Sequence, residues 1–163
     1  MTGWTLFPYA GAATAGASDV ARYLEQQAED GWRHLQDSHF LGMAGKGIFE
    51  ELMEVAEESG AENWDGYGGA PVLAETCRTA YSFLDALPLG TPAPSVAAEA
   101  DGNLSFEWYL NPDWVLSVSI GPDGMLYYAA ILGSGKRSGT EPFFGEVPQD
   151  VLRLIDRVRA HDG

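Results

Sequence analysis

The sequence SVAAEADGNLSFEWYLNPDWVLSVSIGPDGMLYYAAIL, residues 95–132, contains the pattern that decides the fold. Four short runs, residues 95–100, 104–110, 114–120 and 125–132, are separated by segments of Gly, Pro, Asn and Asp. These residue types tolerate a positive φ or favour a turn, so they reverse the chain locally. The stretch therefore predicts one antiparallel meander of four strands.

Alternation along the runs predicts one core face and one wetter face. Leu104, Phe106 and Trp108 alternate with Ser105 and Glu107, and the third run alternates in the same way. The fourth run is apolar at nearly every position, which predicts a central or covered strand. Residues 133–139 follow it and are predicted to form a mobile loop.

About four helices are predicted to pack on this sheet. Ser18 and Asp19 suit the start of a helix whose pattern fades by Phe40, and three glycines in residues 42–47 predict a flexible link. Further helices are predicted from the apolar spacing of residues 48–59, from Pro71 to Leu87, and from Pro148 onward. The prediction is a single α+β domain over residues 18–163, after a loosely ordered N-terminal segment, residues 1–17.

Charge is the strongest compositional feature of the chain. There are 24 acidic and 9 basic residues, a net charge of −15, and between Gly47 and Gly135 Arg78 is the only basic residue. A field of this sign repels nucleic acid and anionic membranes and attracts a basic partner. Simple solubility is the alternative explanation of the same charge.

Cysteine usage and the N-terminus indicate where the protein acts. Cys77 is the only cysteine, which excludes an internal disulfide and a multi-cysteine zinc site within one chain. Residues 1–17 have no basic region, and their apolar run is too short to cross a membrane. We therefore expect a cytoplasmic protein.

The predicted helix over residues 48–59 has a carboxylate face opposite its apolar face. Two of these acids fall in the last turn, where they meet the negative end of the helix dipole. A solvated surface is the common reason for such a face, and a site for a basic partner is the other. The candidate partner-binding residues are Glu50, Glu51, Glu54, Glu57 and Glu58.

The most distinctive motif is NWDGYGG, residues 63–69. Its glycines predict a tight loop decorated with aromatic rings, in which Asp65 can accept backbone amides. A structural role is the first interpretation of Trp64, Asp65 and Tyr67. The alternative is a small enzyme or ligand-binding module in which these three side chains form a pocket with Glu107.

The sequence offers no catalytic, metal or cofactor residue to propose. The segment Gly133–Lys136 lacks the spacing of a phosphate loop, and Arg137 stands where Ser or Thr would hold magnesium. His34 and His39 are five residues apart and do not share a helix face. Cys77 lies on the apolar side of a predicted helix, as a buried thiol would.

Several segments form one set of motifs: NWDGYG at 63–68, the end of a predicted helix at 83–88, DG at 101–102, FEW at 106–108, VSIGPDG at 118–124 and the segment 139–144. Together they resemble a family of small, uncharacterised bacterial proteins that carry a WDGYG-like motif and are often associated with mobile elements. The resemblance covers residues 62–158 and implies an α+β fold in a bacterial or phage setting, without implying any catalytic residue. Gly69 departs from the family pattern, where Ala is expected.

These observations favour a non-catalytic protein that binds a basic protein through its acidic surface. An inhibitor or antitoxin of a nucleic-acid-binding protein, such as an anti-CRISPR type of antagonist, is one such protein, because carboxylates can occupy a groove built for phosphates. No direct contact with nucleic acid or membrane is expected. A self-associating module with an exposed sheet edge is a further possibility, and the oligomeric state stays open.

Overall fold

A computed structural model describes residues 43–161 of the chain. The predicted segment 1–17 and the helix predicted after Ser18 lie outside these residues. The described elements follow one another as α2 (Met43–Glu58), α3 (Ala74–Asp85), β1 (Ser95–Ala98), β2 (Leu104–Asn111), β3 (Trp114–Ile120), β4 (Met125–Leu132), β5 (Gly135–Pro142) and α4 (Gln149–Arg159).

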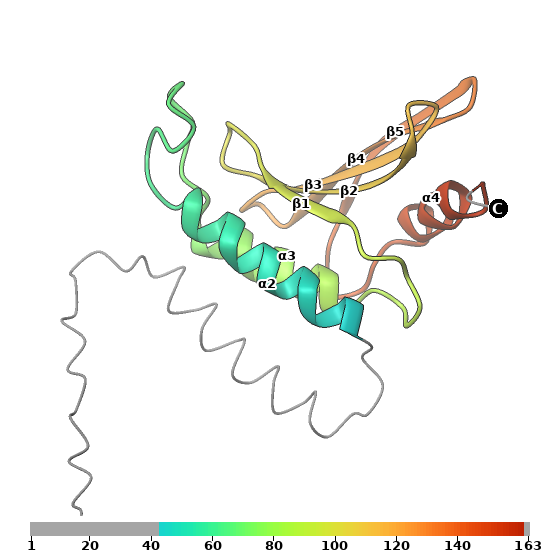
Figure 1. The fold of residues 1–163 in the computed structure, drawn as a ribbon, viewed down its shortest axis with the longest axis horizontal. Coiled ribbons are helices and arrows are strands. Elements are labelled where there is room, and N and C mark those ends of the chain that lie inside the picture. Colours follow the sequence, from blue (N-terminus) through green and yellow to red (C-terminus); the bar gives the residue numbers. More distant parts are fainter. Residues whose placement is uncertain (1–42, 162–163) are drawn as a thin grey trace, which may run out of the picture.

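The strands form one antiparallel sheet in the order β1-β2-β3-β4-β5, so the predicted meander is confirmed (Figure 1). The predicted count of four strands is wrong, because residues 135–142 form a fifth strand where a mobile loop was expected. β5 is mostly exposed and has no apolar alternation, so the backbone pairing with β4 holds it in place. This pairing makes β4 an internal strand, as its apolar composition predicts.

The core lies between one face of the sheet and the helices (Figure 1). Phe106 and Trp108 from β2 are buried there, and the ring of Phe83 from α3 packs on both, with centroids 5.4 and 6.5 Å apart. α4 covers the same face with Val151, Leu154, Ile155 and Val158. Phe83, Phe106 and Val151 are each 0% exposed and belong to one packed core over the described residues. The fold class is α+β.

Two helix starts differ from their predictions. α2 begins at Met43, so Gly45 and Gly47 lie inside the helix and not in a flexible link. Packing of Ile48, Leu52 and Ala56 in the core offsets the low helix propensity of these glycines. α3 begins at Ala74, three residues after Pro71. Within residues 43–161, no helix has the length and apolar character needed to cross a bilayer.

Candidate protein-binding surface

The carboxylates of α2 divide into two groups. Glu51 is half-buried, and its Oε1 accepts the backbone N–H of Val96 on β1 at 2.9 Å. Glu51 therefore holds the helix against the edge of the sheet and is poorly placed to meet a partner. Glu54, Glu57 and Glu58 are exposed, and no ion pair within residues 43–161 involves them. Glu50 is also exposed.

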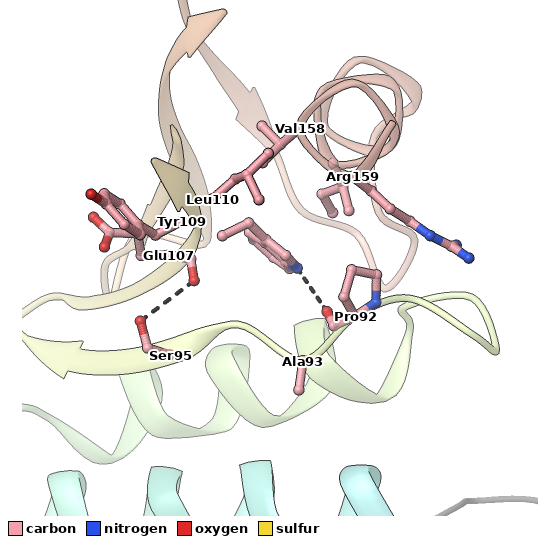
Figure 2. Close-up of a pocket in the computed structure, with 10 residues that line it drawn as sticks. Pro92, Ala93, Ser95, Glu107, Tyr109, Leu110, Val158 and Arg159 are labelled. Carbon is pink, nitrogen blue, oxygen red and sulfur yellow. Dashed lines mark hydrogen bonds between the residues drawn. The ribbon is translucent and has the colours of Figure 1, made fainter. Parts of the chain in front are cut away.

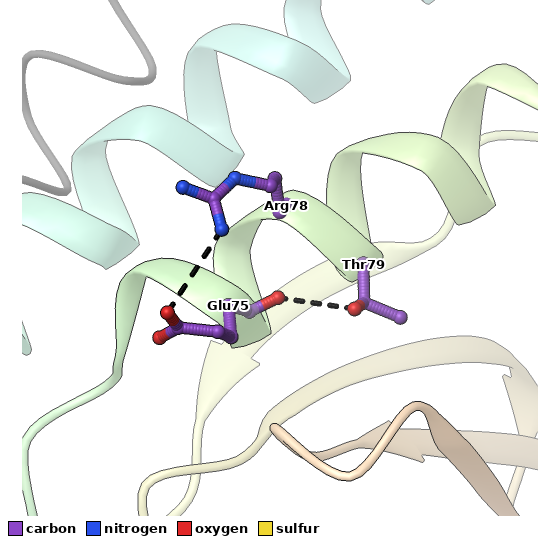
Figure 3. Close-up of polar contacts among 3 residues, drawn as sticks. All are labelled: Glu75, Arg78 and Thr79. Carbon is purple, nitrogen blue, oxygen red and sulfur yellow. Dashed lines mark hydrogen bonds and ion pairs between the residues drawn. The ribbon is translucent and has the colours of Figure 1, made fainter.

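Arg78, the basic residue of this acidic part of the sequence, is engaged on α3. Its guanidinium lies 3.9 Å from the Glu75 carboxylate one turn away, with both side chains half exposed or more (Figure 3). The Thr79 hydroxyl donates to the Glu75 carbonyl oxygen at 3.0 Å. A pair this long and exposed contributes little to stability. The last turn of α2 contains no basic residue.

The loop that follows α2 is fixed by its own hydrogen bonds. The backbone N–H of Asn63 donates to the Gly69 carbonyl oxygen at 2.8 Å, and its side-chain oxygen accepts the N–H of Gly68 at 2.6 Å. Trp64 donates its indole N–H to the Ala70 carbonyl oxygen at 3.0 Å. Asn63 has a φ of 60°, which Asn tolerates better than most residues.

Asp65 is the central acceptor of this loop. Its Oδ1 accepts the N–H of Tyr67 at 2.8 Å and that of Gly69 at 2.9 Å. These bonds favour the ionised form, and they lower the pKa of Asp65 below its ordinary value. A Cβ at position 69 would lie 2.8 Å from the Asp65 Cγ, so the loop requires Gly at this position. The contacts of Asp65 and Trp64 therefore agree with the structural role that the sequence predicts for them.

Tyr67 is the side chain that the loop presents outward. It is 95% exposed, and it stands between Gly66 and Gly68, whose φ values of 76° and 91° few other residues adopt. The backbone under the ring is held by the bonds of Asn63 and Asp65, so the ring is displayed from a fixed position. An aromatic side chain presented in this way loses little conformational entropy on binding.

The structure does not bring Glu107 to this loop. Glu107 lies on β2 opposite Ser95 of β1 and lines a pocket of about 320 Å³ between these strands, Pro92 and α4 (Figure 2). In this view Glu107 and Tyr109 lie on one side of the strand, and Arg159 lies on the other. Three of the four side chains of the alternative pocket therefore share one loop, and Glu107 lies apart from them.

The β1–β2 and β3–β4 turns form a hydrogen-bonded acidic cluster that the sequence pattern did not predict. The Ser119 hydroxyl donates to Glu99 at 2.7 Å, and the Tyr127 hydroxyl donates to Asp123 at 2.6 Å, beside a pocket of about 540 Å³. The Tyr127 bond lowers the pKa of Asp123 and raises that of Tyr127. An acidic turn residue followed by a tyrosine four residues later is the one signal that could have indicated this pair.

The loop after α2 and the acidic turns are neighbours in space. Ala70 donates its N–H to the Ala100 carbonyl oxygen at 2.8 Å, and a Cβ at Gly102 would lie 2.8 Å from the Pro71 carbonyl oxygen. Figure 1 shows this loop and the β1–β2 turn at one end of the molecule, with the β4–β5 hairpin and α4 at the other. The acidic end, as we define it, consists of Glu54, Glu57, Glu58, Glu62, Asp65, Tyr67, Glu99, Asp101 and Asp123.

Two further features bear on chemistry. Cys77 is buried, and burial raises the pKa of its thiol to about 12, so it stays protonated at neutral pH. No group of three or more His, Cys, Asp or Glu side chains in the described part of the chain is arranged to hold a metal ion.

Comparison of the chain with protein-family models, with curated proteins and with solved structures gave no match.

Proposed function

We propose that the protein is a non-catalytic binding protein that recognises a basic protein through its acidic end. The proposal is supported by the separation of charge along the described residues. Glu54, Glu57 and Glu58 are exposed at one end, whereas the basic residues of β5 and α4 are Lys136, Arg137, Arg153, Arg157 and Arg159. A one-sided field steers a basic partner to one face and raises the rate of encounter.

The observation that carries the proposal is the presentation of Tyr67. A loop held at Asn63 and Asp65 displays this ring almost completely exposed, directly after the carboxylates of α2. Interfaces concentrate their binding energy in a few aromatic and Arg anchors surrounded by weaker contacts. In this arrangement Tyr67 is the anchor, and it can stack on an Arg guanidinium of the partner.

The finer proposal is that the partner is a nucleic-acid-binding protein, which this protein inhibits as an antitoxin or an anti-CRISPR type of antagonist would. A groove that neutralises phosphates with Lys and Arg also accepts an array of carboxylates. The single cysteine and the family resemblance fit action in a bacterial cytoplasm. Glu107 lines a different pocket from the loop, so its placement does not support the alternative in which these four side chains form one site.

The test uses the full chain and poly-L-arginine as a basic probe, titrated by calorimetry. Tyr67→Ala is expected to weaken binding by roughly twofold to fivefold, the size of an exposed cation–π contact, and Tyr67→Phe to preserve it. The melting temperature of both variants should equal that of the wild type, since the ring is 95% exposed. Equal affinity of Tyr67→Ala and wild type would refute the role of Tyr67 as an anchor.

A further inference from the structure

The two edges of the sheet are not equivalent. On β1, helix α2 packs alongside the strand, and Glu51 accepts the N–H of Val96. On β5, the register with β4 continues past Pro142, because Phe143 donates its N–H to the Gly124 carbonyl oxygen at 2.9 Å. Hydrogen-bonded and non-hydrogen-bonded positions alternate along an antiparallel pair. The odd-numbered residues of β5 therefore bond to β4, and the even-numbered residues direct their backbone groups outward.

The outward groups belong to Lys136, Ser138 and Thr140, and none of their N–H groups has a hydrogen-bond acceptor within residues 43–161. Pro142, the next outward residue, has no N–H to offer. Such an edge can template pairing with another strand, and proteins commonly block it with charge or proline. The charges of β5 oppose some pairings and favour one.

We propose that β5 pairs antiparallel with the β5 of a second copy of this chain, in the register that places Arg137 opposite Glu141 of that copy. The two-fold symmetry of the pair makes this contact twice. Ser138 and Thr140 then exchange backbone hydrogen bonds across the interface, and the N–H of Lys136 meets the carbonyl oxygen of Pro142. The missing N–H of Pro142 therefore falls at the end of the ladder.

Charge favours this register and disfavours two of the alternatives. A register centred on Arg137 or on Glu141 places two like charges directly opposite each other, which is unfavourable. In the proposed register Gly139 lies on the two-fold axis, and Arg137 and Glu141 are in non-hydrogen-bonded positions, where opposite side chains approach most closely. β5 also begins with two of the basic residues of the chain, Lys136 and Arg137, which lowers the local repulsion between two copies with a net charge of −15 each.

The experiment measures the molar mass of the full chain by size-exclusion chromatography with light scattering over a range of concentrations. The wild type is expected to form a dimer. Arg137→Glu and Glu141→Arg are each expected to weaken the dimer by about tenfold or more, and the double variant to restore it. Lys136→Glu is the matched control: it changes the charge of the same strand equally but faces no charge in the proposed register, so it should leave the dimer intact.

Circular dichroism and thermal unfolding establish that each variant is folded. A wild type that is monomeric at every concentration would overturn the proposal. So would a double variant that fails to restore the dimer, or a Lys136→Glu variant that dissociates as readily as Arg137→Glu.

Discussion

The ring of Tyr128 on β4 lies across Gly139, its cross-strand partner on β5. A Cβ at position 139 would lie 2.5 Å from the Tyr128 Cζ and 3.0 Å from its Cε1, closer than van der Waals contact allows. The glycine weakens a strand by itself, and the aromatic ring covers the gap that it leaves. This contact holds an exposed edge strand that has few apolar side chains of its own.

Gly139→Ala is expected to destabilise the fold by about 1–3 kcal/mol, because the Tyr128 ring must leave its place on β5. Thermal unfolding measures this as a fall of several degrees in Tm. Gly135→Ala in the same strand is the control, since a Cβ there would meet the Leu132 carbonyl oxygen at an ordinary 3.5 Å. Equal Tm values for the two variants would mean that the position of the Tyr128 ring does not require a glycine at position 139.

The Asp65 carboxylate is expected to make the stability of the protein depend on pH in the acidic range. Its pKa is lowered in the folded state from the ordinary 3.8, so its contribution is complete above 3.8 and is lost as the pH falls through the folded value. Asp65→Asn keeps an oxygen acceptor but has no charge to titrate. The difference in Tm between wild type and Asp65→Asn should therefore shrink as the pH is lowered below 3.8. A difference that does not change with pH would contradict the assignment.

Tyr127 is expected to titrate at a lower pH when its acceptor is removed. The hydrogen bond to Asp123 is the main cause of its raised pKa, so Asp123→Asn should move the pKa of Tyr127 back toward 10.0. Spectrophotometric titration, taken as the difference from the same protein with Tyr127→Phe, isolates this residue. Tyr128 is the internal control, because desolvation is the main cause of its raised pKa.

The sequence predicts those parts of the fold in which a strand or helix has one apolar face. β2 and β3 alternate because one side faces the core, and their predicted limits differ from the observed ones by one residue at most. β5 escapes the same reasoning, since its place depends on backbone pairing with β4 and on Tyr128. A strand that buries almost no side chain has no periodic pattern to detect.

The candidate site was predictable where its contacts are local. Asn63, Asp65 and the glycines of the loop predict a turn closed by its own backbone amides, and the structure confirms those contacts. The role of Glu51 was not predictable, because its acceptor oxygen meets Val96, 45 residues further along the chain. Among five carboxylates of one helix, tertiary packing alone separates the structural residue from the exposed ones.

The central claim is that the position of the acidic residues, and not the net charge alone, determines binding. The most direct test compares two triple variants of the full chain in calorimetric titrations with poly-L-arginine. One reverses Glu54, Glu57 and Glu58 to Lys, and the other reverses Asp113, Glu146 and Asp156, which are also exposed but lie outside the acidic end. Both change the net charge by the same amount, and lysines near the end of α2 suit its dipole, so the helix should stay folded.

We expect the first variant to bind at least about tenfold more weakly than the second. Equal losses of affinity in the two variants would contradict the account, because they would show that the probe responds only to the total charge of the protein.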